Sequence, residues 1–397
     1  MTRPIDIRFR GPLAPYHRGF CAELETQGYA PLSASNLVRV FAHLSRWLQN
    51  HRLEPHELTL DRVSKFLRSR QRYTHWRSER GLAPILDYLR RLGVMPPPSH
   101  VADTPLDQFL DHLGDYLQRE RGLALATIRR RQRIARRFLA PFVDSQGIHF
   151  ENLTSGDVTR FVLRECRQWS VGFAKVVVTD LRSLLRFLHL EGHTSTCLAA
   201  AAPAIAGWRG QALPQGLDPT HVRRLLKSCD RRTAIGRRDY AILMLLVRLG
   251  LRAGEATALQ LDDVDWRHGE ILIRGKGRRD ERLPLPPDVG RALMAYLRRG
   301  RPRSTSRAIF LRSRAPYGAL QTVAGRVGQV CIRGGMARLG AHRLRHTAAT
   351  EMLQKGCSLP EVAQVLRHRS LSTTAIYAKV DRKALRALAQ PWPGGRP

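Results

Sequence analysis

The stretch Gly340-Ala341-His342-Arg343-Leu344-Arg345-His346-Thr347 begins the segment around which the rest of the chain is organised. It is followed by Leu366-Arg367-His368 and by Thr373-Thr374-Ala375-Ile376-Tyr377. A planar guanidinium fits two phosphate oxygens, and imidazoles donate or move protons near neutral pH. A tyrosine hydroxyl becomes a nucleophile once a neighbouring group takes its proton. The pattern therefore predicts phosphoryl transfer to a tyrosine, although the prediction rests on the spacing and on partners elsewhere.

The charge of the chain points to a polyanionic partner. The 397 residues are enough for two or three domains, and a hydrophobic content of 43% supports cores of ordinary size. Lys and Arg total 67 against 33 Asp and Glu, which gives a formal net charge of +34. Such an excess opposes compaction by self-repulsion unless a polyanion is the usual partner. Nucleic acid is the expected partner, because Arg and Lys contacts to phosphate supply much of its affinity. A protein kept soluble by charge alone would more often mix both signs.

The cysteines and the apolar segments exclude several classes of protein. No C-x-x-C pair occurs, which argues against a disulfide framework and a structural zinc site. The first ten residues lack the apolar core of a signal peptide. The longest apolar run, Ala241 to Val247, is too short to span a bilayer. A reduced, soluble, cytoplasmic protein without a membrane partner is expected. The scattered cysteines are Cys21, Cys166, Cys197, Cys229, Cys331 and Cys357.

Composition and periodicity divide the chain into three predicted domains. Residues 1–95 are predicted to form an additional helical module, and residues 104–201 a second helical module in which the same features return in the same order. The match leaves both a duplication and a convergent helical pattern open. Prolines at 96–98 and the Ala-, Pro- and Gly-rich stretch 202–216 indicate linkers. Residues 212–397 form the third predicted domain.

The second module carries two basic stripes that are candidates for binding the DNA backbone. A helix predicted over 126–142 and a later helix both place basic residues opposite an apolar face. Taken alone, each stripe is as well explained by a solvated helix face. Together with the overall charge, they predict a DNA clamp. Its residues are Arg129, Arg130, Arg133, Arg136, Arg137, Lys175, Arg182 and Arg186.

The third domain mixes helices with a short hairpin. An N-cap at Asp218 with Pro219 in the first turn predicts a helix start. Arg238 to Arg248 is nearly all apolar, which predicts a central helix ended by Gly250. Strands are expected over 270–274 and 282–285, joined by a turn around Lys276, and residues 323–389 are expected to be helical. The predicted fold class is mainly α with a small antiparallel β-sheet.

Residues 212–383 resemble the catalytic domain of the tyrosine recombinase or phage integrase family, and 104–200 resemble its core-binding domain. The resemblance implies a site-specific DNA recombinase that cleaves and rejoins strands without metal, cofactor or external energy. Its expected partner is double-stranded DNA with a specific recombination site. The matching stretches are Gly250-Leu251-Arg252-Ala253-Gly254-Glu255, Gly275-Lys276-Gly277, His342 to Thr347, Leu366 to His368 and Thr373 to Tyr377.

The resemblance and the chemistry of a phosphodiester together assign a role to each matched residue. Charge builds on two non-bridging oxygens during attack, and preorganised cations stabilise it. Arg252 and Arg345 are expected to hold those oxygens. Tyr377 is expected to attack phosphorus and to keep a 3′-phosphotyrosyl bond. A free tyrosine has a pKa of about 10 and needs a base, for which His342 is the candidate.

The departing oxygen and the phosphate need further donors. Lys276, on the hairpin turn, is expected to give a proton to the 5′-oxygen, and His368 is expected to donate a hydrogen bond to the phosphate. His342 and His346 stand four apart as in a zinc pair, but the glutamate of H-E-x-x-H is absent, because Arg343 follows His342. His346 is expected to be structural. Arg367 stands where the family usually has glycine.

The tail and the first module bear on the biological role. A short helix over 381–389 is expected to dock onto a neighbouring protomer, in a homo- or hetero-tetramer on DNA, or else to fold back onto its own domain. The additional module favours the integrase or transposase of a bacterial mobile element. Two alternatives stay open: a type IB topoisomerase-like relaxing enzyme, and a non-catalytic DNA-binding architectural protein.

Overall fold

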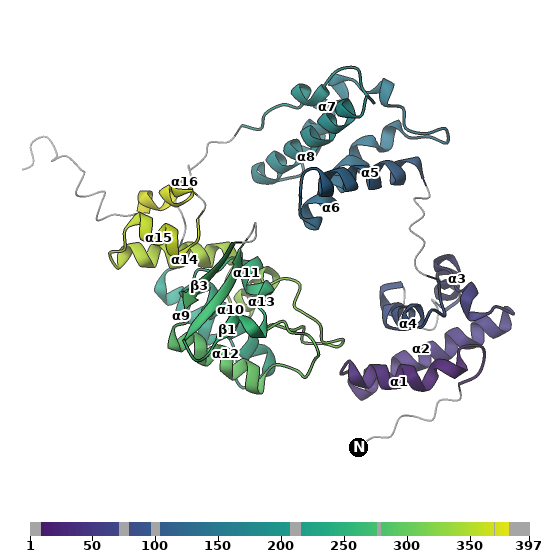
Figure 1. Cartoon of the computed structure of the whole chain (residues 1–397), viewed down its shortest axis with the longest axis horizontal. Coiled ribbons are helices and arrows are strands. Elements are labelled where there is room, and N and C mark those ends of the chain that lie inside the picture. The colour runs from purple at the N-terminus through teal and green to yellow at the C-terminus, as the bar shows by residue number, and fades with distance from the viewer. Residues whose placement is uncertain are drawn as a thin grey trace, which may run out of the picture. The chain divides into compact units, whose positions relative to one another are not determined.

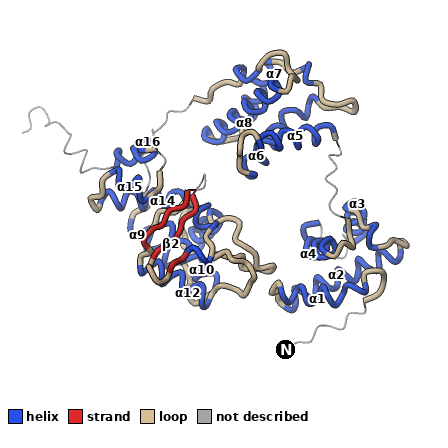
Figure 2. The backbone as a smooth tube through the Cα atoms, in the orientation of Figure 1, coloured by secondary structure: helices blue, strands red, loops and turns tan. Residues whose placement is uncertain are grey.

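The computed structural model describes residues 9–70, 79–96, 104–206, 216–275, 279–368 and 370–380. Within these ranges the chain is mainly helical with one small antiparallel sheet, as Figures 1 and 2 show, and the predicted fold class is confirmed. The chain divides into two compact units, residues 97–209 and the remainder. The finer division at 1–95, 104–201 and 212–397 stays a prediction.

The described part of residues 1–96 is built from helices around its own core. The helix α2 shows why these helices form and pack: Leu37, Phe41, Leu44 and Leu48 recur at a spacing of three or four and are all buried. The aromatic ring of Phe20, from α1, packs against that of Phe41. The helices are α1 His17–Thr26, α2 Pro31–Asn50, α3 Leu60–Arg70 and α4 Glu79–Arg91.

Residues 97–209 form a separate helical unit. The helix α7 begins at a capping box, in which the Thr154 hydroxyl accepts from the Asp157 amide and the Asp157 carboxylate accepts from the Thr154 amide. The helix α6 begins at Leu125, which is exposed, and ends at Leu139, so the helix expected over 126–142 is shorter than predicted. The helices are α5 Pro105–Arg119, α6 Leu125–Leu139, α7 Ser155–Cys166 and α8 Val171–Leu190.

The described residues from 216 onward pack around the helix α10. It runs from Ala234 to Arg248 and is buried almost all round, as expected for a central helix, but it begins four residues earlier than the sequence indicated because Thr233 caps it. The predicted cap at Asp218 is confirmed, since its carboxylate accepts from the Thr220 amide at 2.7 Å. The helices are α9 Pro219–Lys227, α10 Ala234–Arg248, α11 Ala253–Ala258, α12 Pro287–Arg299, α13 Ala324–Arg333, α14 Ala341–Gln354, α15 Leu359–Val365 and α16 Leu371–Thr374, with the 3₁₀ segment η7 Ala375–Val380.

The small sheet has the strand order β1-β2-β3 and is antiparallel throughout. Its strands are β1 Val264–Asp265, β2 Glu270–Gly275 and β3 Arg279–Pro284, shown in red in Figure 2. Ile271 and Ile273 point into the core, and the residue between them does not, as a half-buried strand requires. The predicted hairpin is confirmed, although β3 begins three residues earlier than expected. The sequence did not indicate β1, because a strand of two residues carries no periodic signal.

The last described helices enclose the tyrosine. The helix α14 packs against α10, and α15, α16 and η7 follow it closely in space (Figure 1). Ala349 and Leu353 of α14, Val362 of α15 and Leu366 share one apolar cluster with Tyr377. Among the described residues, none of the helices combines the length and the apolar character that a membrane span requires.

Candidate active site

Arg345 lies at the centre of the predicted site and is 1% exposed. Its guanidinium donates to the carbonyl of Gly250, which precedes α11, and to the carbonyl of Leu366, which follows α15. Burial, and then the charge of Arg252, lower its pKa to about 10, so the group stays charged at neutral pH. One buried cation therefore joins three separate parts of the chain.

Arg252 is the N-cap of α11 and is held from two sides. It donates to the Glu255 carboxylate at 2.6 Å and to the Arg367 carbonyl at 3.1 Å. Its side chain remains 42% exposed, whereas that of Glu255 is 6% exposed. The carboxylate thus fixes one edge of the guanidinium and leaves part of the group accessible to a ligand, which is what a phosphate contact requires.

Arg367 lies just after α15 and adopts the left-handed conformation, with φ of 56°. The amide of His368 donates to the Ala363 carbonyl and that of Arg367 to the Gln364 carbonyl, which is the Schellman pattern that glycine usually completes. The charge of Arg367 does not face the site, because its guanidinium donates to Glu255 at 2.8 Å and its side chain is 4% exposed. The turn that positions His368 is therefore kept without glycine.

The phenol of Tyr377 is buried and is hydrogen-bonded to His346, not to His342. The Nδ1 atom of His346 lies 2.7 Å from the Tyr377 hydroxyl. His342 packs edge-to-face against His346, with ring centroids 4.4 Å apart, and is exposed. No residue near His346 along the chain reveals this contact, which is why sequence reasoning favoured only a structural role for it. The available signal is the spacing of four, which places both histidines on one helix face.

His368 lies beside the same phenol. Its ring is stacked with that of Tyr377, with centroids 6.4 Å apart and planes 2° apart. Its Nδ1 atom is bonded to the Thr374 hydroxyl at 2.6 Å. Burial, followed by the charges of Arg345 and Arg252, lowers the pKa of His368 to about 4. It is therefore neutral at neutral pH and can still donate one hydrogen bond.

Five of the six residues predicted to be catalytic can thus be placed, and they come together. Lys276 lies outside the described residues, and so does the predicted tail helix at 381–389. The described strands place the ends of the turn that carries Lys276 at Gly275 and Arg279. Over the described ranges, His, Cys, Asp and Glu side chains do not gather in groups of three or more that could hold a metal ion.

The predicted DNA clamp contains two kinds of arginine. Arg130 donates to the buried Asp180 at 2.6 and 3.0 Å, and Arg137 donates to the buried Glu165 at 2.9 Å. Arg136 pairs with Asp107, and Arg182 donates to the carbonyl of Ala202 at 2.7 Å. These side chains tie helices of their own unit together. In contrast, the stripe members Arg129, Arg133 and Arg186 are exposed, and Lys175 is half-buried.

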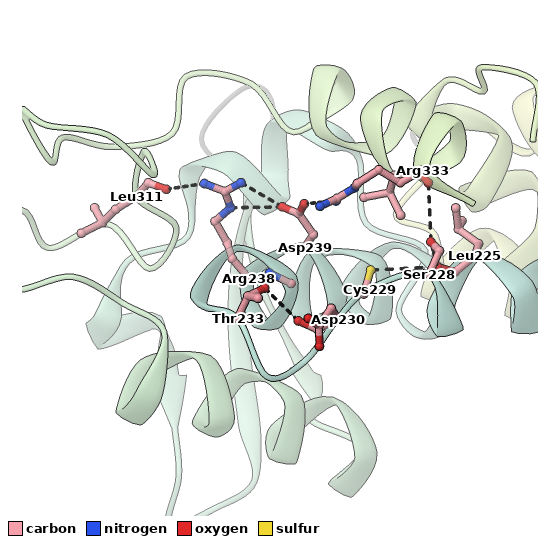
Figure 3. Close-up of polar contacts among 11 residues, drawn as sticks. Leu225, Ser228, Cys229, Asp230, Thr233, Arg238, Asp239, Leu311 and Arg333 are labelled. Atoms are coloured by element: carbon pink, nitrogen blue, oxygen red, sulfur yellow. Dashed lines mark hydrogen bonds and ion pairs between the residues drawn. The ribbon is translucent and has the colours of Figure 1, made fainter. Parts of the chain in front are cut away.

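A buried polar network braces α10 behind the site. Arg238 donates to Asp239 at 2.9 Å and to the carbonyl of Leu311 at 3.1 Å, and Arg333 of α13 donates to the other oxygen of Asp239 at 2.5 Å (Figure 3). Arg238 and Asp239 are each 2% exposed. Because a buried charge is tolerated only when paired, this network fixes α13 and the loop at Leu311 to the start of α10.

A basic cavity of about 1200 Å³ lies near the start of α10, and none of the predicted catalytic residues lines it. Arg231, Arg291 and Arg299 are among its lining residues. Since α10 has 15 residues and a helix rises about 1.5 Å per residue, this cavity and Gly250 are separated by roughly 20 Å. The cavity is distinct from the cluster around Tyr377.

Comparisons with known proteins agree with this geometry. Residues 215–384 match the family described as "Phage integrase family". The putative integrase/recombinase y4rA of Sinorhizobium fredii is 38% identical over 99% of this chain and 97% of its own length. The tyrosine recombinase XerC of Oceanobacillus iheyensis is 31% identical over 71% of this chain and 94% of its own length.

Solved structures share the fold. The XerH recombinase in a post-cleavage complex with its difH substrate has a TM-score of 0.54 at 21% identity, over 82% of this chain and 93% of that one. Lambda integrase bound to a core site has a TM-score of 0.52 at 16% identity, over 68% of this chain and 95% of that one. The topoisomerase and architectural alternatives are not favoured by these findings. The chain belongs to the phage integrase family and is a tyrosine-type site-specific DNA recombinase.

Proposed function

We propose that this recombinase cuts and rejoins DNA through a covalent bond between Tyr377 and a 3′-phosphate. We further propose that it does so as the integrase or transposase of a mobile element, in a tetramer assembled on specific recombination sites. The observation that carries the proposal is the convergence of two guanidiniums and three imidazoles, from α14 and the segments around α11 and α15, on one buried phenol.

The arrangement suits in-line attack on a phosphodiester. Arg252 and Arg345 lie close enough for the charge of Arg252 to contribute to the lowered pKa of Arg345. Two cations held this closely, at a cost in repulsion, are stabilised when an anion binds between them. The non-bridging oxygens of a scissile phosphate supply that anion.

The reaction balances without an external co-reactant. The Tyr377 oxygen bonds to phosphorus as its proton leaves for a base, and the bond from phosphorus to the 5′-oxygen breaks. Lys276 protonates that oxygen. In religation a 5′-hydroxyl of the new strand attacks phosphorus, the phosphotyrosyl bond breaks, and the phenol regains its proton. The energy of the original bond is retained in the intermediate.

The mobile-element role is supported by the names of relatives. The relative aligned over nearly the whole chain is called a putative integrase/recombinase. A solved structure of the same fold is titled as the integrase of the transposon Tn1549 with circular intermediate DNA, with a TM-score of 0.51. The alignment with y4rA covers 99% of this chain and so takes in most of residues 1–95, which favours a role for that module within the recombinase.

A covalent trap tests the proposal. The Tyr377→Phe variant selects a binding duplex from random sequence, and the same duplex, nicked beside the cleavage point, is then offered to the wild type. Wild type should accumulate a protein–DNA adduct, in EDTA as well as in magnesium, because the cations of the protein stabilise the transferring phosphoryl group. The variant should bind equally and form no adduct. Adduct formation by the phenylalanine variant would refute the assignment of Tyr377.

A further inference from the structure

We propose that His346, rather than His342, is the proton acceptor for Tyr377: its Nδ1 atom holds the hydroxyl in the free protein and takes the proton when a phosphodiester is bound. This inference rests on the proposed role of Tyr377. It assigns a catalytic function to a residue that the sequence marks only as a neighbour of Arg345 on α14.

The distances favour His346 over the other two imidazoles. Proton transfer needs heavy atoms about 2.6–3.2 Å apart, and the separation of Nδ1 and the hydroxyl is 2.7 Å. His342 lies on the same helix face one turn earlier and touches the ring of His346, not the phenol. His368 stacks on the phenol ring, and its Nδ1 atom is occupied by Thr374. The phenol thus has one imidazole nitrogen aimed at its oxygen among the described residues.

The charges around His346 keep it neutral before DNA arrives. His342 and Arg345 face it from its own helix, and Tyr377 faces it from η7. Arg252, Arg367 and Glu255 act on Arg345 from the segments before and within α11 and after α15. Burial, then His342 and Arg345, lower the pKa of His346 to about 4, while burial raises the pKa of Tyr377. In the free protein the proton therefore stays on the phenol, and neutral Nδ1 accepts a hydrogen bond from it.

Binding of the substrate reverses this balance. A phosphodiester bound by Arg252 and Arg345 places a negative charge beside the cations that disfavour protonated His346, so the basicity of the imidazole rises. During attack the bond between the Tyr377 oxygen and its proton breaks, the bond from Nδ1 to that proton forms, and the oxygen bonds to phosphorus. His342, which is exposed, remains available to the phosphate itself. Activation of the nucleophile is in this way coupled to occupation of the site.

Asparagine substitutions separate the two histidines. In His346→Asn the side-chain amide oxygen lies where Nδ1 lies and accepts a hydrogen bond, but it cannot accept a proton. His346→Asn should bind the nicked duplex within about threefold of wild type and form the adduct about 100- to 1000-fold more slowly, in the range expected for loss of a general base. The matched variant His342→Asn should keep a single-turnover rate within about tenfold of wild type, because its group contacts only the phosphate.

The pH dependence gives a readout that a structural role would not change. The wild-type single-turnover rate should fall at low pH as the imidazole becomes protonated, and this acidic limb should be absent in His346→Asn and present in His342→Asn. An unchanged limb in His346→Asn, with loss of the limb in His342→Asn, would overturn the proposal and return the role to His342.

A measurement on the free protein separates this inference from the reaction itself. With 3-fluorotyrosine incorporated, the ¹⁹F resonance of Tyr377 is identified by its loss in Tyr377→Phe. It should shift in His346→Ala and His346→Asn and hold its position in His342→Asn. If wild type forms no adduct on any duplex, the proposed function fails while this shift still reports the hydrogen bond. A resonance that responds to His342 and ignores His346 refutes the inference directly.

Discussion

The guanidinium of Arg345 donates to the carbonyl of Gly250, two residues before Arg252. The two arginines predicted to hold the scissile phosphate are therefore held in position by a direct contact between the segments that carry them. A second bond from Arg345 to the Leu366 carbonyl adds the turn that carries His368. The site is assembled by its own predicted catalytic residue as much as by the core beneath it.

Replacement of Arg345 should accordingly affect both stability and catalysis. Arg345→Lys keeps the charge but cannot bond both buried carbonyls with a single amine. Since each buried carbonyl left unpaired costs about 1–3 kcal/mol, we expect the free energy of unfolding to fall by an amount in that range, and adduct formation to slow by at least about 100-fold. Urea unfolding and a suicide-substrate assay measure the two effects. Lys355→Ala, which removes an exposed ion pair at the end of the same helix, is the control and should change stability by less than about 0.5 kcal/mol. Equal losses in both variants would contradict the explanation.

Glu255 should make stability depend on pH. Burial alone would raise its pKa, but the charge of Arg367 and the hydrogen bonds from Arg252 and Arg367 outweigh burial, and the net pKa is lowered. A carboxyl whose pKa is lower in the folded protein contributes its full stability above the unfolded pKa, here 4.5, and loses it as pH falls through the folded value.

The difference in melting temperature between wild type and Glu255→Gln should therefore be largest near pH 7 and shrink below about pH 4.5. Thermal unfolding of both proteins from pH 7 to pH 3 measures it. The comparison with the glutamine variant removes the effect of the other carboxylates. A difference that stays constant over this range would show that the carboxylate is not stabilised by its two arginines.

The two kinds of arginine in α6 should respond differently to alanine. Arg129→Ala and Arg133→Ala should each lower the salt slope of DNA binding by about 0.9, because each variant neutralises one phosphate fewer, and should leave stability within about 0.5 kcal/mol. Arg130→Ala should instead destabilise the unit, by roughly 3–5 kcal/mol in the limit of a fully buried pair and less for this part-exposed one, because Asp180 is left without its bidentate partner. Filter binding across a salt series and urea unfolding distinguish the two outcomes. An unchanged slope in both exposed variants would remove α6 from the DNA interface.

Arg367→Gly tests whether the unusual residue is tolerated or required. Glycine relieves a left-handed conformation that costs other residues about 1–2 kcal/mol. It also removes a buried partner of Glu255, and loss of one partner of a buried pair costs about 3–5 kcal/mol. We expect a net loss of stability in urea unfolding, smaller in the double variant with Glu255→Gln than the sum of the two single losses. A more stable glycine variant would mean that the ion pair contributes little.

The sequence predicted the features that depend on local pattern. The central helix, the cap at Asp218 and the hairpin follow from apolar periodicity and turn chemistry, and the fold class is confirmed. Family motifs brought Arg252, Arg345 and Tyr377 to attention although they lie far apart in the chain. The fold could be anticipated because each of these signals lies within a few residues of the element that it specifies.

Pairing between distant side chains could not be predicted in the same way. Arg129 and Arg130 are adjacent on a basic helix, and only the packing of α8 decides that Arg130 faces Asp180 while Arg129 faces outward. His346 meets the phenol through η7, whose position depends on how α15 and α16 fold back onto α14. The direction in which Arg367 turns its charge, toward Glu255, also depends on tertiary packing.

The burial of Tyr377 has a consequence for the life of the protein in a genome. A chain with a net charge of +34 will spend much of its time on unrelated duplexes, held by phosphates alone. A nucleophile that is 1% exposed and bonded to an imidazole cannot reach those phosphates. Searching is thereby separated from cutting, and chromosomes scanned by this enzyme are left without accidental nicks.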